Sequence, residues 1–231
     1  MSAFSTVTAI LVIAIPVIIA ITFHEAAHGY VAWKLGDDTA RRLGRVTFNP
    51  IKHIDVFGTI LLPIVMWVTT SFIFGYAKPV PVDFARLNRP RRDMILVAAA
   101  GPGINLALAL VSAILLHFAA LFEGNAGTIL TFALQASVFI NVLLAVFNML
   151  PLPPLDGGRV AVGLLPDALA RPLARLERWG FPILIFVLLI VPAIASQFGS
   201  SFSPFWSVIA PIVRFVVEII STITGIEAGL R

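Results

Sequence analysis

The strongest constraint on this sequence is the length of its apolar segments. A helix needs about 20 consecutive apolar residues to span the hydrocarbon of a bilayer. Within lipid, backbone N–H and C=O groups must be satisfied inside the segment, which favours helices. The chain is 59% hydrophobic and only 12% charged. We therefore predict an all-α polytopic membrane protein with about five to six membrane-embedded segments, at residues 4–33, 56–76, 94–122, 128–152, 180–197 and 205–223.

The charge distribution predicts how these segments are oriented. Lys and Arg concentrate in the loops at 34–52, 78–92 and 159–178, whereas 123–127 and 196–203 contain none. Cytoplasmic loops of membrane proteins carry such an excess of basic residues. We therefore expect the three basic loops on the cytoplasmic side of a cell membrane. The same rule accounts for the net charge of +4, so we expect no nucleic-acid partner.

The segment at 56–76 does not fit a simple span. With the basic loops in the cytoplasm, both of its ends lie on the same side of the membrane. Its glycines and its proline suit a break or a reversal of the chain. We predict a re-entrant segment here, and the alternative is an ordinary span with one basic loop outside.

Two short segments flank this region, "GRVTFNP" at 44–50 and "AKPVPVDF" at 77–84. Both have roughly alternating apolar positions bounded by Gly or Pro, a pattern typical of strands. We predict short β-strands between the first and second full spans, with the two prolines confining the second strand to an edge.

The first apolar segment ends in "HEAAH", which begins at His24. Charged and metal-binding groups are rare in membrane helices unless they face a cavity or act in function. His24 and His28 are four residues apart and so share one helix face, with Glu25 beside them. This H-E-x-x-H pattern binds zinc through the two histidines and uses the glutamate as a general base. The alternative is a set of polar side chains satisfied by neighbouring helices.

A catalytic zinc site takes three protein ligands and leaves one position open. The chain has no cysteine, so a thiolate ligand is excluded. Among the carboxylates, Asp156 stands out because it follows an apolar helix in "FNMLPLPPLDGGRV". The prolines stop that helix, and the glycine pair permits a tight turn. In the predicted topology, Asp156 and the two histidines lie on the same side of the membrane.

Three motifs in order, "HEAAHGYVAWKLGD", "AAAGPGINLALAL" and "FNMLPLPPLDGGRV", resemble the site-2 protease family of intramembrane zinc metalloproteases. More closely, they resemble the compact prokaryotic group without PDZ or CBS domains. The resemblance implies that His24, His28 and Asp156 bind Zn²⁺ and that Glu25 activates water. It also implies that Asn148 lies close to the scissile bond.

The expected function is therefore hydrolysis of peptide bonds within or near transmembrane segments of membrane proteins, in the lipid bilayer. We expect a catalytic membrane core at 1–165 and C-terminal membrane helices at 166–231. Two alternatives use the same residues without hydrolysis. One is a metal-binding transporter or sensor, and the other is an inactive scaffold that binds membrane helices.

Three further polar residues have less specific patterns. Asn105 and Asn141 are expected to hydrogen-bond between membrane helices, as such residues commonly do. His53 is open to two interpretations, a role near the metal or a histidine in an interfacial loop.

Overall fold

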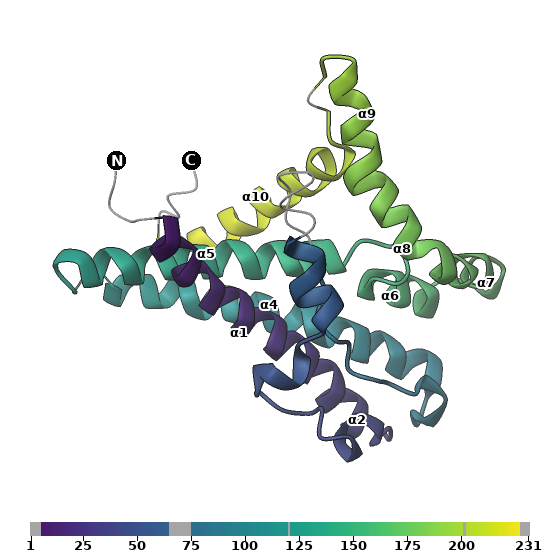
Figure 1. Cartoon of the computed structure of the whole chain (residues 1–231). Coiled ribbons are helices and arrows are strands. Elements are labelled where there is room, and N and C mark those ends of the chain that lie inside the picture. The colour runs from purple at the N-terminus through teal and green to yellow at the C-terminus, as the bar shows by residue number, and fades with distance from the viewer. Residues whose placement is uncertain (1–5, 65–74, 120, 201, 227–231) are drawn as a thin grey trace.

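The structure is a computed structural model that describes residues 6–64, 75–119, 121–200 and 202–226 (Figure 1). Its regular elements are all helical, and short 3-10 or π-helical turns are labelled η. In chain order they are α1 (Thr6–Lys34), α2 (Thr39–Arg42), η1 (Pro50–His53), η2 (Val56–Leu61), η3 (Phe84–Arg86), α4 (Pro90–Ala119), α5 (Gly124–Asn148), α6 (Asp156–Leu164), α7 (Asp167–Arg175), α8 (Glu177–Ile185), η4 (Phe186–Ile190), α9 (Val191–Gln197) and α10 (Pro204–Thr224).

Five helices of the described residues are long and apolar enough to cross a membrane. They are α1, α4, α5, the continuous α8–η4–α9 helix and α10. Many large apolar side chains on them are exposed, as expected where lipid replaces water. The prediction of an all-α polytopic membrane protein is confirmed.

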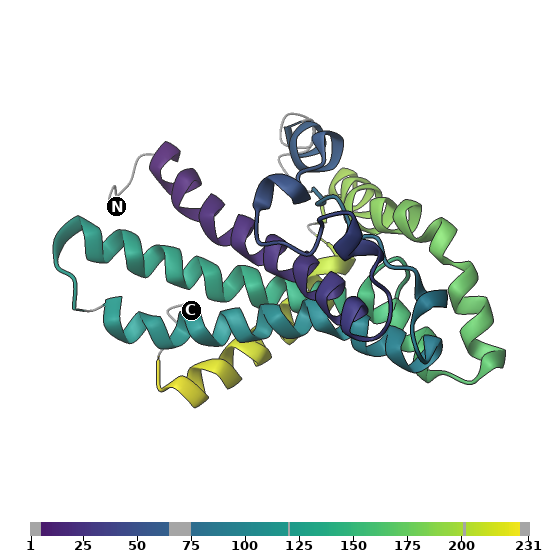
Figure 2. The same ribbon diagram turned by 90° about the horizontal axis from the view of Figure 1, so that it is seen from below.

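Helices α4 and α5 form a long antiparallel hairpin, and α1 crosses it (Figures 1 and 2). Helix α10 packs along the same hairpin, and its buried side chains meet those of α4 and α5 in one apolar cluster. In that cluster the buried residues from α4 are both alanines, Ala109 and Ala113. Small residues let membrane helices approach closely, so they set the tight contact of this bundle.

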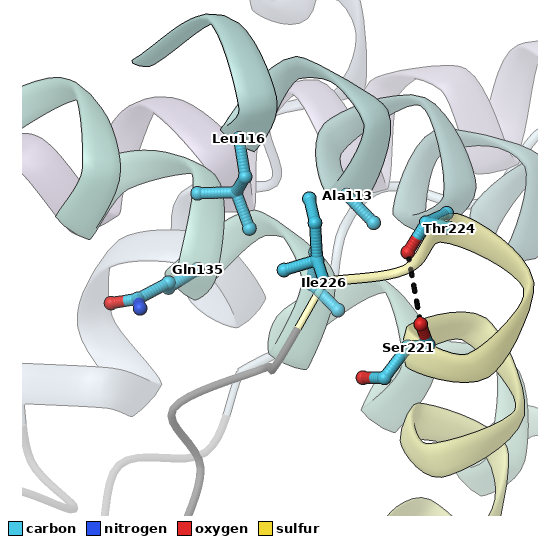
Figure 3. Close-up of a pocket in the computed structure, with 7 residues that line it drawn as sticks. Ala113, Leu116, Gln135, Ser221, Thr224 and Ile226 are labelled. Carbon is cyan, nitrogen blue, oxygen red and sulfur yellow. Dashed lines mark hydrogen bonds between the residues drawn. The ribbon is translucent and has the colours of Figure 1, made fainter. Parts of the chain in front are cut away.

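The C-terminal end of α10 packs against the C-terminal end of α4. Gly225 ends the helix with a left-handed φ of 71°, a conformation that glycine adopts at little cost. Ile226 then turns back among Leu116 and Gln135 (Figure 3). The ring Nε2 of His117 lies 2.8 Å from the Thr224 carbonyl. Helix α10 therefore runs parallel to α4 and antiparallel to α5.

The α8–η4–α9 helix leaves this bundle and projects away from it (Figure 1). Its first part packs closely, because Leu184 and Leu188 are buried against Leu155 and Phe205. Helix α9 has no buried residue. The bundle of α1, α4, α5 and α10 is thus the framework, and α8 joins it beside the start of α6.

The two ends of the segment at 56–76 lie together. The Tyr76 N–H donates to the Gly58 carbonyl at 3.0 Å, and the Thr59 hydroxyl donates to the Tyr76 carbonyl at 3.0 Å. A full span would separate its ends by about 30 Å. The two ends of the segment therefore lie at one level, as a re-entrant segment requires. Residues 65–74, which form the middle of the predicted segment, lie outside the described residues.

The prediction of short β-strands is wrong for the described residues, which contain no strand. Residues 44–50 form turns that lead into η1. Residues 77–83 are extended, but Val80 and Asp83 donate their N–H groups to the carboxylates of Glu25 and Asp37. Prolines at 79 and 81 have no N–H to donate. Side-chain acceptors thus take the place of a partner strand.

Asp37 anchors one end of this extended segment to the end of α1. Its carboxylate is fully buried and accepts from the Thr39 hydroxyl, the Thr39 N–H and the Asp83 N–H. Burial alone would raise the pKa of this carboxyl. The hydrogen bonds outweigh burial and hold the pKa below its usual range.

The re-entrant arrangement predicts the labelling of single cysteines introduced at Lys52 and Arg86. Since the wild type has no cysteine, each variant reports one site. Both should react with a membrane-impermeant maleimide from the same face, and a cysteine at Glu123 should react from the other face. Labelling of Lys52→Cys and Arg86→Cys from opposite faces would contradict the arrangement.

Candidate metal centre

Three ligand-type side chains converge where α1 meets the start of α6. His24 and His28 lie one helical turn apart on α1, and their Nε2 atoms are 3.0 Å from each other. Asp156 is the first residue of α6. Its Oδ2 lies 3.2 Å from His24 Nε2 and 3.3 Å from His28 Nε2. The three atoms form a nearly regular triangle.

The opposite nitrogens of the two imidazoles are held by acceptors on α4. His28 Nδ1 lies 2.7 Å from the Val97 carbonyl, and His24 Nδ1 lies 2.6 Å from the Asn105 Oδ1. A carbonyl only accepts, so each Nδ1 carries the proton. In the neutral ring, the lone pair of each Nε2 then faces Asp156. Such hydrogen bonds fix the tautomer and ring direction of metal-ligating histidines.

These residues fit a zinc ion. Ligands at about 2.0–2.1 Å in a tetrahedral site lie about 3.3 Å from one another, close to the spacing seen here. Asp156 Oδ2 is buried without a hydrogen-bond partner among the described residues. Two lone pairs and a carboxylate oxygen facing one another in a buried site repel, and a cation relieves that repulsion. The donor set of two imidazoles and one carboxylate is one that zinc prefers.

A buried polar network connects His24 to two other helices. Asn105 on α4 donates its amide N–H groups to the Ala20 carbonyl and to Asn141 Oδ1, which leaves its own oxygen for His24. Asn141 on α5 donates to the Ser137 carbonyl. Both asparagines are fully buried. The prediction that they hydrogen-bond between helices is confirmed, and Asn105 also orients an imidazole.

Glycines allow the backbone to come this close. A Cβ on Gly101 of α4 would lie 2.5 Å from His28 Nε2 and 2.6 Å from His24 Nε2. A Cβ on Gly157 or Gly158 would collide with the backbone of the proline-rich turn that precedes α6. Gly101 of the "GPGIN" motif therefore lets α4 approach the histidines, and the glycines of "LDGG" let α6 pack on the turn before it.

His24, His28 and Asp156 form what we call the metal-type cluster. Glu25 lies beside this cluster, and all four side chains line one cavity. Its Oε2 accepts a 2.7 Å hydrogen bond from the Val80 N–H. Val80 is buried in the extended segment that covers α1. This contact involves only one of the two carboxylate oxygens of Glu25.

The cavity has a volume of about 490 Å³, within the range of small-molecule and peptide-sized sites. Helices α1, α4, α5, α6 and α8 all contribute to its wall, together with the extended segment. Asn148, at the end of α5, lies on this wall and donates one amide N–H to the Leu144 carbonyl at 2.9 Å. The hollow shown in Figure 3 is far smaller, about 10 Å³, which is room for about one water.

His53 is not part of the group of possible metal ligands among the described residues. Its ring is buried, and Nε2 lies 2.9 Å from the Thr47 carbonyl. The His53 carbonyl accepts from the Lys78 N–H at 2.9 Å. His53 thus joins two segments that cover α1, and its position at a membrane interface stays a prediction.

Comparison with known proteins agrees with this geometry. The sequence pattern of peptidase family M50 matches residues 12–125 and 123–191. The chain belongs to peptidase family M50. It is 40% identical over 186 residues to "Putative zinc metalloprotease YwhC" of Bacillus subtilis, covering 77% of this chain and 80% of the relative. It is 31% identical over 183 residues to "Putative zinc metalloprotease Rip2" of Mycolicibacterium smegmatis, covering 78% and 67%.

No solved structure matches the chain. Membership of M50, the site-2 protease family, supports an intramembrane metalloprotease, and both of these relatives are named as zinc metalloproteases. The resemblance drawn from the three motifs is therefore confirmed, and His24, His28 and Asp156 form a group that could hold the metal named for these relatives.

The hydrogen bond from His24 to Asn105 predicts that Asn105→Ala weakens zinc binding. Loss of a residue that orients a ligating histidine commonly costs about 10- to 100-fold in metal affinity. Competition with a chelator of known affinity would measure the change. Ser112→Ala, at the far end of the same polar network, is the matched control and should change zinc affinity much less. Equal affinity in wild type and Asn105→Ala would contradict this role.

Proposed function

We propose that this M50 protein is a zinc metalloendopeptidase that cleaves transmembrane segments of membrane proteins. The observation that carries the proposal is the convergence of His24, His28 and Asp156 beside Glu25 in one cavity. This set contains three ligands and a free base, which a hydrolytic zinc site requires.

In this proposal His24 and His28 bind zinc through Nε2, and Asp156 binds it through Oδ2. When bound, zinc supplies Lewis acidity, which polarises a peptide carbonyl and lowers the pKa of water. Val97 and Asn105 hold the two rings in the orientation that binding needs. Most of the surface of these three side chains is buried, and electrostatic interactions are stronger in such a site than in bulk water.

Glu25 is proposed as the general base. Its Oε2 is held by the Val80 N–H, and the other oxygen takes a proton from the attacking water. The carboxyl then delivers this proton to the nitrogen of the leaving amine as the peptide bond breaks. Glutamate commonly serves in this role beside a histidine pair of this spacing.

Asn148 is proposed to bind the substrate next to the scissile bond. An amide nitrogen has two N–H groups to donate, and one of those of Asn148 bonds to the Leu144 carbonyl. The second can donate to the substrate carbonyl and, more strongly, to the oxyanion that develops there. The position of Asn148 on the cavity wall supports the proposal.

The proposed substrates are transmembrane proteins that reach the cavity from the lipid bilayer. We place the active site toward the cytoplasmic side, since the basic loops adjoin both α1 and α6. In this arrangement residues 1–165 form the catalytic core, and residues 166–231 are membrane helices that complete the wall through α8.

A metal-binding transporter or sensor would use the same ligands without Glu25, and an inactive scaffold would not need the ligands. The hydrogen bond that holds Glu25 beside the cluster favours the protease, because neither alternative gives that carboxylate a function.

Glu25→Gln tests the proposed function. Purified in detergent, the variant should retain zinc as wild type does, because Glu25 is not among the ligands. Cleavage of transmembrane peptides should fall by about 10² to 10⁴, the usual contribution of a general base. Glu123→Gln, in the loop between α4 and α5, is the control and should cleave normally. Cleavage by Glu25→Gln at the wild-type rate would refute the role of Glu25.

A further inference from the structure

The guanidinium of Arg45 is buried outside the cavity that holds the metal-type cluster. Arg45 follows Gly44, whose φ of 65° ends the turn after α2, and its exposed fraction is only 8%. Its partners among the described residues are backbone carbonyls rather than a carboxylate, and its Nε has no hydrogen-bond partner there. Burying a charged group with few partners is costly, so this placement calls for a function.

Arg45 holds the extended segment at residues 77–82. Its Nη2 donates to the Lys78 carbonyl at 2.7 Å and lies 3.4 Å from the Pro79 carbonyl. Few other backbone hydrogen bonds hold this segment, because Pro79 and Pro81 have no N–H to donate. One of those few joins the Lys78 N–H to the His53 carbonyl.

The peptide group between Pro79 and Val80 connects Arg45 to Glu25. Its C=O faces the Arg45 guanidinium, and its N–H donates to Glu25 Oε2 at 2.7 Å. A trans peptide is planar, with its C=O and N–H directed oppositely. Holding the carbonyl of this peptide therefore sets the direction in which its N–H points.

The same contacts seat Val80 against α1. Its side chain is buried, and its Cγ1 would lie 3.0 Å from a Cβ built on Gly29. Gly29 follows His28 directly, so the segment packs on the turn of α1 that carries the histidine pair. A shift of the segment would thus move the donor away from Glu25.

We propose that Arg45 is a positioning residue for Glu25. By holding the carbonyls of Lys78 and Pro79, it aims the Val80 N–H at one oxygen of Glu25 and leaves the other oxygen free for the proton. The inference rests on the proposed role of Glu25 as the base. In this proposal Arg45, which lies in a loop, orients the carboxylate of Glu25 on α1.

The test compares Arg45→Met, Arg45→Lys and the control Arg42→Met. Methionine removes the donors but keeps an apolar stem, and replacing buried charge by apolar volume is often neutral for folding. Arg42 is the last residue of α2, three positions before Arg45, and its exposed side chain pairs with Asp38. Each purified variant is measured for zinc content, kcat and KM on a transmembrane peptide, and backbone hydrogen exchange.

Hydrogen exchange supplies a readout that does not depend on activity. Within residues 78–82 only Lys78, Val80 and Val82 have an exchangeable amide, because the other two residues are prolines. In Arg45→Met this segment should exchange about tenfold faster, as expected for a lost charge-assisted hydrogen bond. Glu25→Ala should also speed exchange there, since it removes the acceptor of the Val80 N–H.

For Arg45→Met, kcat should fall about tenfold to hundredfold, the scale expected for a misplaced catalytic group. KM should stay within about twofold, and zinc content should match wild type. Arg45→Lys should give intermediate exchange and kcat, because an ammonium is a point donor rather than a planar fork. Arg42→Met should match wild type in every measurement.

Three results would overturn the proposal: wild-type exchange in Arg45→Met, faster exchange with a wild-type kcat, or parallel loss of zinc, thermal stability and kcat, which indicates structural support alone. If Arg45→Met does not fold, Arg45→Lys decides by the same measurements, and wild-type values would refute the proposal. A wild-type protein that binds zinc but cleaves nothing would refute the proposed function instead, and the exchange rates would still report whether Arg45 and Glu25 hold this peptide.

Discussion

The rest of this structure depends on a buried cluster of electron-rich atoms that a metal cation would stabilise. His24, His28 and Asp156 direct two imidazole nitrogens and a carboxylate oxygen at one point, within 3.0–3.3 Å of one another. Such a cluster is costly to bury without a positive charge, and a bound metal ion would supply one. The surrounding helices are built to impose it. Acceptors on α4 set the rings, and Gly101 lets α4 approach them.

The bundle also satisfies its own polar groups, which lipid cannot do. Asn105 and Asn141 connect α1, α4 and α5 in a chain of hydrogen bonds that begins at His24. Polar residues between membrane helices need partners inside the protein. Here the same bonds hold the helices together and orient the His24 ring. The same hydrogen bonds therefore contribute both to the stability of the core and to the geometry of the site.

Much of this was predictable from sequence because it follows from periodicity and charge. Helical spacing placed His24 and His28 on one face, and the basic loops predicted that 56–76 begins and ends on one side. The two β-strands were predicted wrongly, since an extended pattern does not reveal that carboxylates will accept its N–H groups. The contacts of Arg45 and of the Val97 carbonyl could not be predicted. Every residue has a backbone carbonyl, so the sequence does not indicate which carbonyl accepts a hydrogen bond from a histidine. In the sequence, Arg45 resembles the other basic residues of the predicted cytoplasmic loops.

The segment at 77–82 illustrates how covering loops can serve a membrane-embedded site. It lines the cavity, and one of its peptide groups bridges Arg45 and Glu25. Proline at two positions suppresses strand pairing and so reserves the remaining N–H groups for particular acceptors. In the proposed mechanism the active site is thus formed jointly by membrane helices that supply ligands and by an irregular segment that orients the base.

Whether two distant parts of the chain hold one zinc ion is tested most directly by X-ray absorption at the zinc edge. The zinc-loaded protein should show two imidazole nitrogens and a carboxylate oxygen at about 2.0–2.2 Å. In Asp156→Ala the oxygen shell should change, and in His24→Ala one imidazole should be lost. A wild-type spectrum in both variants would place the metal elsewhere and contradict the assignment of these ligands.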